Sequence, residues 1–426
     1  MKKRLTLADL TPGMILAEAL CREDGVLLLP ASTVLTPRHL SLFPSWAVKA
    51  AVVLDPQGMS CDPQSPCPPS APEPRIPSEH LDAAEALLLP RFVHARLDQP
   101  AMETIFAVCL PWAAKHLAEH GPAAVALPVS VASDSLPPPP ETPAPGPMAL
   151  VASEPKLTTL PDVFVRITEV LDNPVSTSKE AAEAIGMDTG LSMVLLRLVN
   201  SAFYGFPVKV DTLSRAVTIV GSRQLTTLAL GLSVLALFKD MPGGLVDMRS
   251  FWKHSIGCGV LAAALASSED GSLEIERLFV AGLLHDVGRL VLYRCLPRHM
   301  AHILAGARAE GRLLREAERR ALGYDHAVLG GMLLKRWRFP ENLEKTVRQH
   351  HGMPAQQPTS MAAAVHVADA LVNALSLGSS GEVYVPPVSP LAWEALRLTP
   401  GRLATVVALA DAQREDILRI FLPDEA

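Results

Sequence analysis

Residues 278–296 read LFVAGLLHDVGRLVLYRCL, and the interpretation of the whole chain depends on this stretch. Its apolar residues predict one long helix, yet His285 and Asp286 stand side by side in its middle. Burying an imidazole and a carboxylate on an apolar helix is costly unless both find partners. Gly282 and Gly288 flank the histidine on the same helix face, and each costs about 1 kcal/mol relative to alanine. The stretch therefore predicts either a close helix crossing with a hydrogen-bonded His–Asp pair, or a metal or phosphate site.

The composition restricts the class of protein. A chain of 426 residues with 49% hydrophobic and 19% charged residues is large enough for two or three domains, and its many alanines and leucines favour helices. A net charge of −6 without a basic tract argues against a nucleic-acid partner. We find no secretory signal and no apolar run long enough to span a membrane, and the six cysteines lack metal-binding spacing. These features predict a cytoplasmic protein with reduced thiols and no membrane partner.

Two Pro-rich segments divide the chain. The expected parts are a small β-rich module at 1–55, a Pro-rich linker at 56–77, a helical segment at 78–122, a second Pro-rich linker at 123–156, a helical domain at 157–375 and a C-terminal helical extension at 376–426. The run SLPPPPETPAPGP in the second linker predicts an extended or disordered tether between separately folded parts. After residue 156 only EVYVPPV, at 382–388, is strand-like.

Histidines and aspartates gather in the second half of the helical domain. They lie in or at the ends of separate predicted helices, at His254, His285, Asp286, His326, His350, His351 and Asp369. A helical bundle can direct such side chains to one interior point, where imidazole and carboxylate ligands suit Fe, Mn, Ni or Zn. A metal there would support hydrolysis of a phosphate ester. The alternative is a polar cluster whose members hydrogen-bond one another and hold the helices in register.

The order H…HD…H…HH…D resembles the HD superfamily of metal-dependent phosphohydrolases. The segments that narrow the resemblance to the HDOD domain, a regulatory relative, are LVNSAFYG at 198–205, AVTIVGSRQLTTLALGLS at 216–233, FVAGLLHDVGRLVL at 279–292 and GYDHAVLGGMLLKRWRFP at 323–340. The resemblance covers about residues 157–375 and implies a mainly α fold, a multi-helix HD-like bundle. Its first helical half would be 157–240 and its HD-like half 250–375. Residues 1–55 are similar to the module that often precedes HD-GYP phosphodiesterase domains.

The resemblance also implies a ligand set. His254, His285, Asp286 and Asp369 would hold a first ion, and His326 with His350 or His351 a second. Two features depart from HD-GYP enzymes. The histidine doublet is followed by Gly352 without a later Gly-Tyr-Pro motif, and Arg289 replaces the usual lysine. Arg289 is expected to contact phosphate or another ligand.

Three functions follow from this resemblance. The first is an intracellular signal-transduction protein, not an enzyme, whose HDOD domain is a platform for a partner protein or a small signalling molecule. Its N-terminal module would be a second interaction site, and its oligomeric state stays open. The second is a metal-dependent phosphohydrolase acting on a nucleotide or cyclic dinucleotide. The third is nucleotide binding without hydrolysis.

Several other polar residues receive simpler interpretations. His299 and His302 share a helix face and are expected to be solvated, whereas His366 is expected to be a satisfied core or rim histidine. His116 and His120 lie one turn apart without an evident carboxylate companion. The segment NSAFYG is either a recognition loop or, as we favour, a helix end closed by glycine with its aromatics packed beneath.

Overall fold

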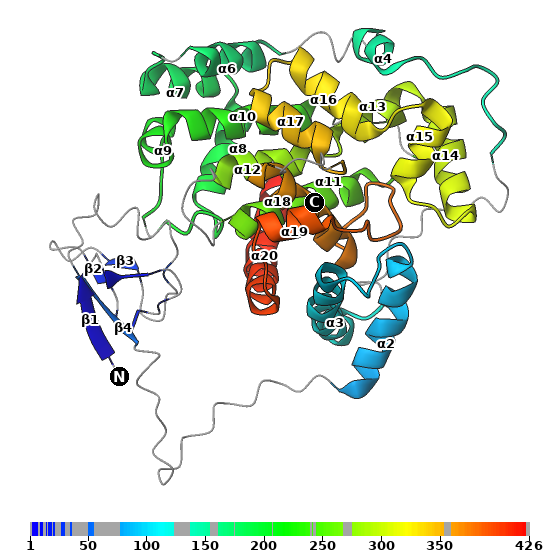
Figure 1. Cartoon of the computed structure of the whole chain (residues 1–426). Coiled ribbons are helices and arrows are strands. Elements are labelled where there is room, and N and C mark those ends of the chain that lie inside the picture. The colour runs from blue at the N-terminus through cyan, green and yellow to red at the C-terminus, as the bar shows by residue number, and fades with distance from the viewer. Residues whose placement is uncertain are drawn as a thin grey trace. The chain divides into compact units, whose positions relative to one another are not determined.

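The computed structural model is mainly helical, with two small antiparallel strand pairs near the N-terminus (Figure 1). It describes residues 77–122, 137–153, 161–238 except 174 and 207, 241, 244–266, 275–352 and 359–422, together with strands and single positions between 2 and 54. Two compact units divide the chain, the smaller formed by 1–75, 205–209 and 267–273, and the larger by the remaining residues. The predicted fold class, mainly α with a β-rich N-terminal part, is confirmed.

The strands of the small unit form two pairs. They are β1 (Lys2–Thr6) with β4 (Ala50–Leu54), and β2 (Leu20–Cys21) with β3 (Leu27–Leu29), both antiparallel. In β4, Ala51 and Val53 are buried whereas Val52 is half-buried, as the two-residue period of a one-sided strand requires. Leu16 forms a bridge to Val53 and is itself buried. These apolar residues give the small unit its own core.

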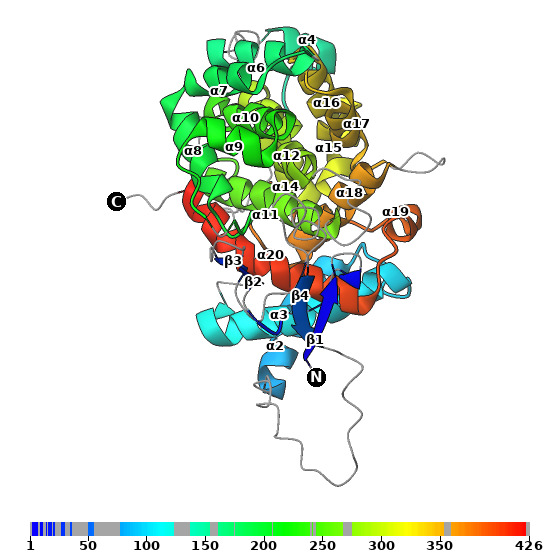
Figure 2. The ribbon, with the colours of Figure 1, turned by 90° about the vertical axis from the view of Figure 1, so that its left-hand side faces the viewer.

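The larger unit is built from helices. In chain order they are α2 (Ser78–Leu88), η3 (Leu89–Phe92), α3 (Pro100–His120), α4 (Pro147–Ser153), α6 (Asp162–Asp172), α7 (Ser178–Gly186), α8 (Thr189–Val199), α9 (Leu213–Val220), α10 (Ser222–Leu237), α11 (Met248–Ala266), α12 (Ile275–Leu284), α13 (Val287–Cys295), α14 (Pro297–Ala309), α15 (Leu314–Leu322), α16 (His326–Arg336), α17 (Glu341–Gln349), α18 (Ser360–Ala374), α19 (Pro390–Ala395) and α20 (Pro400–Phe421). α11 lies at the centre and packs against α12, α18 and α20. Figure 2 shows α20 between α11 and α3.

The stretch from residue 278 to 296 is not one helix, so that expectation is wrong. α12 ends at Leu284 and α13 begins at Val287, with His285 and Asp286 in the turn between them. Asp286 has a φ of −98° and a ψ of 11°, outside the helical range. Adjacent residues on a continuous helix do not face each other. Breaking the helix at the pair lets both side chains reach one interior point.

Two glycines bring neighbouring helices close to this turn. A Cβ on Gly282 would lie 2.6 Å from the Cα of Gly259, where α12 crosses α11. A Cβ on Gly288 would lie 2.0 Å from the carbonyl oxygen of His326, at the start of α16. Real Cβ atoms do not approach other atoms this closely, so both positions require glycine. The close approach predicted from the two glycines is confirmed.

The helical hairpin of α2 and α3 packs on α18 and α20 in the larger unit and is not set apart from the HD-like half. The buried Arg91 in η3 donates to the hydroxyl of Ser376 and to the carbonyl of Asn373. The backbone N–H of Val385 donates to the Arg91 carbonyl over 2.8 Å. Residues 382–388 therefore form a loop held by the hairpin, and the described residues show no strand there.

The NSAFYG segment follows the interpretation that we favoured. Asn200 caps the C-terminus of α8 and accepts a hydrogen bond from the N–H of Val210 at 2.7 Å. Phe203 and Tyr204 are buried, and the Tyr204 hydroxyl lies 3.1 Å from the carboxylate of Glu276. Gly205 takes a φ of 61° that favours glycine. The segment is a packed helix end.

The described helices were compared with the length and hydropathy that a membrane-spanning helix needs. No single helix among them is both long and apolar enough to cross a bilayer. Only α9 and α10 taken together pass on length and composition, and they meet at a bend of 116°.

The glycine contacts generate a stability prediction. Gly288→Ala should destabilise the protein by about 3 kcal/mol or more, because the added methyl collides with backbone atoms of α16 that cannot move aside. Gly306→Ala is the matched control, since a Cβ at Gly306 in α14 meets nothing within 4 Å. That control should be neutral or up to about 1 kcal/mol more stable. Denaturant unfolding compares the two, and equal midpoints would contradict the close crossing.

Candidate metal centre

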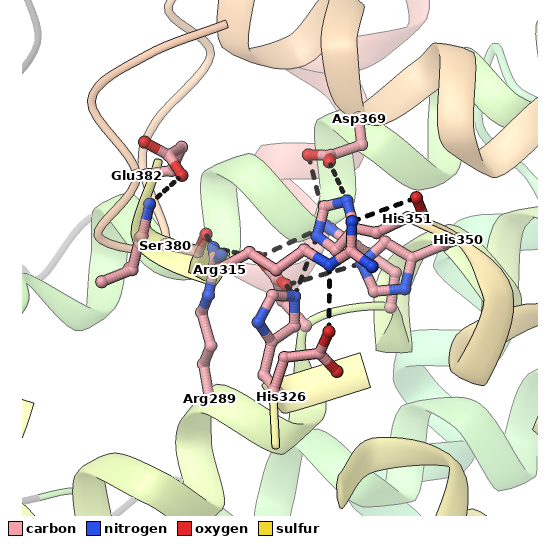
Figure 3. A network of polar contacts seen from close by, with 12 residues as sticks. Arg289, Arg315, His326, His350, His351, Asp369, Ser380 and Glu382 are labelled. Atoms are coloured by element: carbon pink, nitrogen blue, oxygen red, sulfur yellow. Dashed lines mark hydrogen bonds and ion pairs between the residues drawn. The ribbon is translucent and has the colours of Figure 1, made fainter. Parts of the chain in front are cut away.

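Side chains from five places in the chain converge on one buried point (Figure 3). They are His254 from α11, His285 and Asp286 from the turn, His326 from the start of α16, His350 and His351 from the end of α17, and Asp369 from α18. Their side chains are at most 8% exposed. The structure thus brings together all seven residues that the sequence suggested as metal ligands, which we call the His–Asp cluster.

One part of the His–Asp cluster surrounds the Nε2 atoms of His254 and His285, which lie 3.3 Å apart. The Nε2 atom of His254 is 3.6 Å from Asp286 Oδ2 and 3.5 Å from Asp369 Oδ1. His285 Nε2 lies 3.4 Å and 3.6 Å from the same two oxygens. His254, His285 and Asp286 present ligand atoms that all lie within 4.8 Å of one another, and Asp369 does so with His285 and His350. Either group could hold one cation.

The second part of the cluster surrounds the other carboxylate oxygen of Asp286. His326 Nε2 lies 3.0 Å from Asp286 Oδ1, and His350 Nε2 lies 3.9 Å from it. His351 Nε2 is 3.0 Å from His326 Nε2. Asp286 therefore presents Oδ2 to the first group and Oδ1 to the second. Asp369 also reaches both groups, since its Oδ1 lies 3.5 Å from His254 Nε2 and its Oδ2 lies 3.7 Å from His351 Nδ1.

Hydrogen bonds on the outer side of three rings fix their tautomers. The pairs are His285 Nδ1 with the Gly282 carbonyl at 2.7 Å, His350 Nδ1 with the Val347 carbonyl at 2.6 Å, and His326 Nδ1 with Glu318 Oε2 at 2.5 Å. Oxygen acceptors require that Nδ1 carries the proton, so in the neutral rings the lone pair is on Nε2. This is the arrangement of metal-binding histidines. The Nε2 of His350 and the Oδ1 of Asp286 are buried without a hydrogen-bond partner.

Arg289 is a buried link within the site. Its Nη1 donates to Asp286 Oδ2 at 2.9 Å and to the hydroxyl of Ser380, and its Nε donates to Glu318 Oε1 at 3.2 Å. Figure 3 shows its guanidinium beside Ser380. The pKa of Asp286 lies well below its usual range because its charged neighbours, first Arg289, outweigh the effect of burial. Its contact with a phosphate stays a prediction, although the side chain also lines the cavity described below.

The charges of the site do not balance when the imidazoles are neutral. Asp286, Glu318 and Asp369 are buried carboxylates, whereas Arg289 is the buried guanidinium that pairs with two of them. This leaves two negative charges, which is costly in a low-dielectric interior. Added positive charge, either protons on the imidazoles or a divalent cation, would therefore stabilise the buried carboxylates.

The excess of buried negative charge raises the pKa of two histidines of the cluster, whereas the pKa of a third is lowered. Burial and Arg289 act to lower the pKa of His326, but Glu318 and Asp286 outweigh them and raise it to about 9. The pKa of His285 is likewise raised, because carboxylates and the Cys258 thiol overcome the effect of burial. Burial and the neighbouring imidazoles lower the pKa of His350 to about 3. His350 is thus held neutral, with a lone pair available to a cation.

A cavity of about 120 Å³ reaches the cluster at His351 and Asp369. Arg315 and Glu316 of α15 line one side of it, and the loop containing Glu382 lines the other. The Nη1 of Arg315 donates to the His351 carbonyl at 3.2 Å. The cavity therefore gives a small molecule a route to the cluster past a partly exposed guanidinium.

The loop at 376–389 is fastened at several points around the cavity. His366 donates from Nδ1 to the His350 carbonyl at 2.6 Å and accepts from the Ser389 N–H at 2.9 Å. His366 is therefore a satisfied buried histidine, as predicted. Glu382 accepts from the N–H of Leu314 at 2.8 Å. His366 therefore connects the loop to His350 of the cluster, and Glu382 connects it to the start of α15.

Sequence analysis missed the residues that support the ligands, namely Glu318, Arg315, Ser380 and Glu382. One signal could have identified Glu318. In α15 it lies four residues from both Leu314 and Leu322, so it is an acid on the apolar face of an amphipathic helix. Ser380 and Glu382 lie in a loop, where no periodicity marks them. His116, in α3, has Asp411 Oδ1 at 3.7 Å from its Nε2, but it stacks on Trp112 and belongs to no described metal-like group.

Comparison with known proteins identifies this part of the chain. Residues 157–353 match the family model described as the HDOD domain. A solved structure of an HDOD domain protein of unknown function from Geobacter sulfurreducens is 26% identical, with a TM-score of 0.52, covering 65% of this chain and 97% of that one. The sequence and the fold therefore agree on the domain.

Two further proteins are similar over part of the chain. An uncharacterised protein of Treponema pallidum is 27% identical over 196 residues, which are 46% of this chain and only 37% of that protein. A Shewanella amazonensis structure, provisionally named a phosphohydrolase, is 26% identical at a TM-score of 0.44, covering 61% of this chain and 98% of that one. Neither bears on the activity of this chain.

The buried ion pairs of Arg289 generate a prediction. Arg289→Met should cost about 3–5 kcal/mol, because it leaves Asp286 and Glu318 buried without their guanidinium. Paired carboxylates with lowered pKa stabilise the fold above their unfolded pKa and lose this contribution as the pH falls. In the variant, burial without the guanidinium would raise the pKa of both carboxylates, so that they take up protons on folding. Lower pH therefore stabilises the variant relative to the wild type. The difference in the free energy of unfolding between the two proteins should shrink between pH 7 and pH 5.

Urea unfolding at both pH values measures this effect. The matched control is Arg312→Ala, because Arg312 pairs with Glu310 at the surface and should contribute at most about 0.5 kcal/mol at either pH. A loss in Arg289→Met as small as that in the control would show that the buried pairs do not stabilise the fold.

Proposed function

The chain contains an HDOD domain of the HD superfamily, and from that premise we propose that it is a regulatory signal-transduction protein whose His–Asp cluster binds divalent metal. The observation that carries the proposal is the carboxylate of Asp286, whose two oxygens face two separate groups of imidazoles. Fixed tautomers turn Nε2 lone pairs toward it, and the surrounding charge is negative. Each of these properties fits cation binding.

The residues divide into two ligand sets with Asp286 in common. His254 and His285 complete the first set, with Asp369 Oδ1 3.5 and 3.6 Å from their Nε2 atoms, and His326 with His350 and His351 completes the second. Imidazole and carboxylate ligands without thiolates suit Fe, Mn, Ni or Zn. Glu318 and Arg289 would orient the ligands from behind, since each is bonded to one of them. A bound ion would supply Lewis acidity and tie five segments of the helical domain together.

A regulatory role fits the surroundings of the cluster better than turnover of a large substrate. The cavity of about 120 Å³ is well below the roughly 300–1,000 Å³ of sites for drug-sized ligands. Arg289 is committed to three buried partners and is not free to move toward a phosphate. A small signalling molecule or a partner protein is therefore the ligand class that we propose. The N-terminal β-rich unit would be a second interaction site, and the protein would act in the cytoplasm.

Metal content tests the proposal directly. The purified chain, incubated with Mn²⁺, Fe²⁺, Ni²⁺ or Zn²⁺ and desalted, should retain up to two equivalents by elemental analysis. Asp286→Ala should lose both, because both ligand sets share its carboxylate. Asp369→Ala should mainly reduce the first site and His326→Ala the second.

A matched control keeps this test specific. His120→Ala removes an exposed histidine of α3 that belongs to none of the metal-like groups, so metal retention should be unchanged. Substoichiometric metal in the wild-type chain after incubation, or equal retention by Asp286→Ala and His120→Ala, would show that the cluster is only a polar core.

A metal-dependent phosphohydrolase is the second candidate, and one observation favours it. The cavity connects the cluster to solvent beside Arg315, whose side chain is 23% exposed and carries a guanidinium suited to an anionic oxygen. The narrow cavity would admit a terminal phosphoryl group more readily than a cyclic dinucleotide. In this function Arg315 would orient the ester, and the cluster would hold the ions.

Activity measurements separate the two candidates. Metal-loaded protein would be assayed with phosphomonoesters, nucleotides and cyclic dinucleotides. The regulatory proposal expects no turnover above that of Asp286→Ala on any of them. Turnover that Asp286→Ala abolishes, and that Arg315→Ala weakens mainly through KM, would establish the enzyme instead.

A further inference from the structure

The second Pro-rich segment is held against the helical domain by side chains that hydrogen-bond its backbone. We call residues 137–147 the Pro-rich strap. The contacts are His302 Nδ1 with the Pro137 carbonyl at 2.8 Å, His299 Nε2 with the Thr142 carbonyl at 3.0 Å, and the Tyr324 hydroxyl with the Pro145 carbonyl at 2.8 Å. His299 and His302 lie on α14, and both were expected to be solvated. They are half-buried and contact the strap instead.

The strap turns a regular face toward the domain. Pro137, Pro140, Ala144 and Pro147 are half-buried, whereas the other residues of the strap are exposed. The three-residue spacing between Pro137 and Pro140 is that of a polyproline II helix, the bend at 141–142 lies before Ala144, and Pro147 begins α4. Beyond the strap, α4 packs on α16 and buries Leu150 and Val151, which anchors its C-terminal end (Figure 1).

This arrangement has the chemistry by which proline-rich peptides are recognised. A polyproline II helix makes no internal hydrogen bonds, so its carbonyls are available to donors on a receptor surface. Imidazole and phenol groups offer both a donor and a flat apolar ring.

We propose that the surface formed by His299, His302 and Tyr324 is a binding site for a proline-rich segment of a partner protein, which the strap occupies in the absence of that partner. All three side chains contact backbone carbonyls of the strap, and proline or alanine fills each of its half-buried positions. A partner segment of similar composition would supply the same groups. This inference goes beyond the proposed function and does not depend on metal binding.

The strap is held weakly enough to be exchanged. Three hydrogen bonds give a small net stabilisation, because each replaces a bond to water, and most of the strap stays exposed. Its tether to α4 gives it an effective concentration on the order of millimolar at the site. A free peptide with a Kd of roughly 100 μM for the vacant site would therefore appear about tenfold weaker against the intact chain.

Peptide binding to the full chain tests the proposal. In one variant, residues 137–147 are replaced by a Gly/Ser sequence of equal length. The probe is a fluorescent synthetic peptide of residues 135–149, and a Gly/Ser peptide of equal length is the negative control. Fluorescence anisotropy should show saturable binding to the replaced chain and binding at least about tenfold weaker to the wild type. Equal affinity for the two peptides, or no binding to the folded variant, would overturn the proposal.

Point variants tie the binding to the surface. Within the replaced chain, Tyr324→Phe and His302→Ala together should weaken the probe at least about tenfold, because both carbonyl contacts are lost. His120→Ala, on α3, is the matched control and should leave the affinity unchanged. Equal weakening by both would contradict the assigned surface.

A second measurement covers the case in which the replaced chain does not fold. Glu141 is exposed within the strap and is a cleavage site for a glutamate-specific protease. Excess unlabelled peptide should accelerate cleavage after Glu141 in the wild-type chain, as should the Tyr324→Phe and His302→Ala pair without peptide. Cleavage that neither treatment changes would refute an exchangeable strap.

Discussion

The burial of the Asp286 carboxylate is the constraint on which the rest of the larger unit depends. A carboxylate that is 1% exposed is costly to bury unless positive or polar groups surround it. Arg289 meets one side, and imidazoles from α11, α16 and α17 meet the others. The glycines at 282 and 288 let α11 and α16 approach closely enough for this. The break between α12 and α13 and the close helix crossings at the two glycines therefore all serve to surround this one buried charge.

The kinds and order of the candidate ligands could be predicted from the sequence, because they fall in or beside five separate helical segments. The break at His285 could not, since the apolar pattern continues from Leu284 into Val287 without a proline, and Asp286, although at the N-cap of α13, makes no capping hydrogen bond. The partners behind the ligands are also hidden. Glu318 and Ser380 reach Arg289 from positions 29 and 91 residues away along the chain, and only the fold determines such pairings.

The helical segment at 78–122 shows how a part outside the resemblance contributes to the site. Through Arg91 and its carbonyl, the hairpin holds the loop at 376–389, and that loop lines the cavity. Both segments lie outside the region of about 157–375 that resembles the HDOD domain. Composition suggested that residues 78–122 are separated from the rest by two linkers, because Pro-rich sequence indicates that the linkers form no core of their own. It does not report which surface a short hairpin later covers.

Composition is equally silent on which surface the Pro-rich strap covers. Composition predicted an extended segment but not the side chains that bind its carbonyls. One of those side chains, Tyr324, directly precedes Asp325 and His326. Asp325 caps α16 through the Val328 N–H at 3.0 Å and pairs with Arg315, which lines the cavity. The side chain that bonds the Pro145 carbonyl is therefore adjacent in sequence to the capped start of α16, where the candidate metal ligand His326 lies.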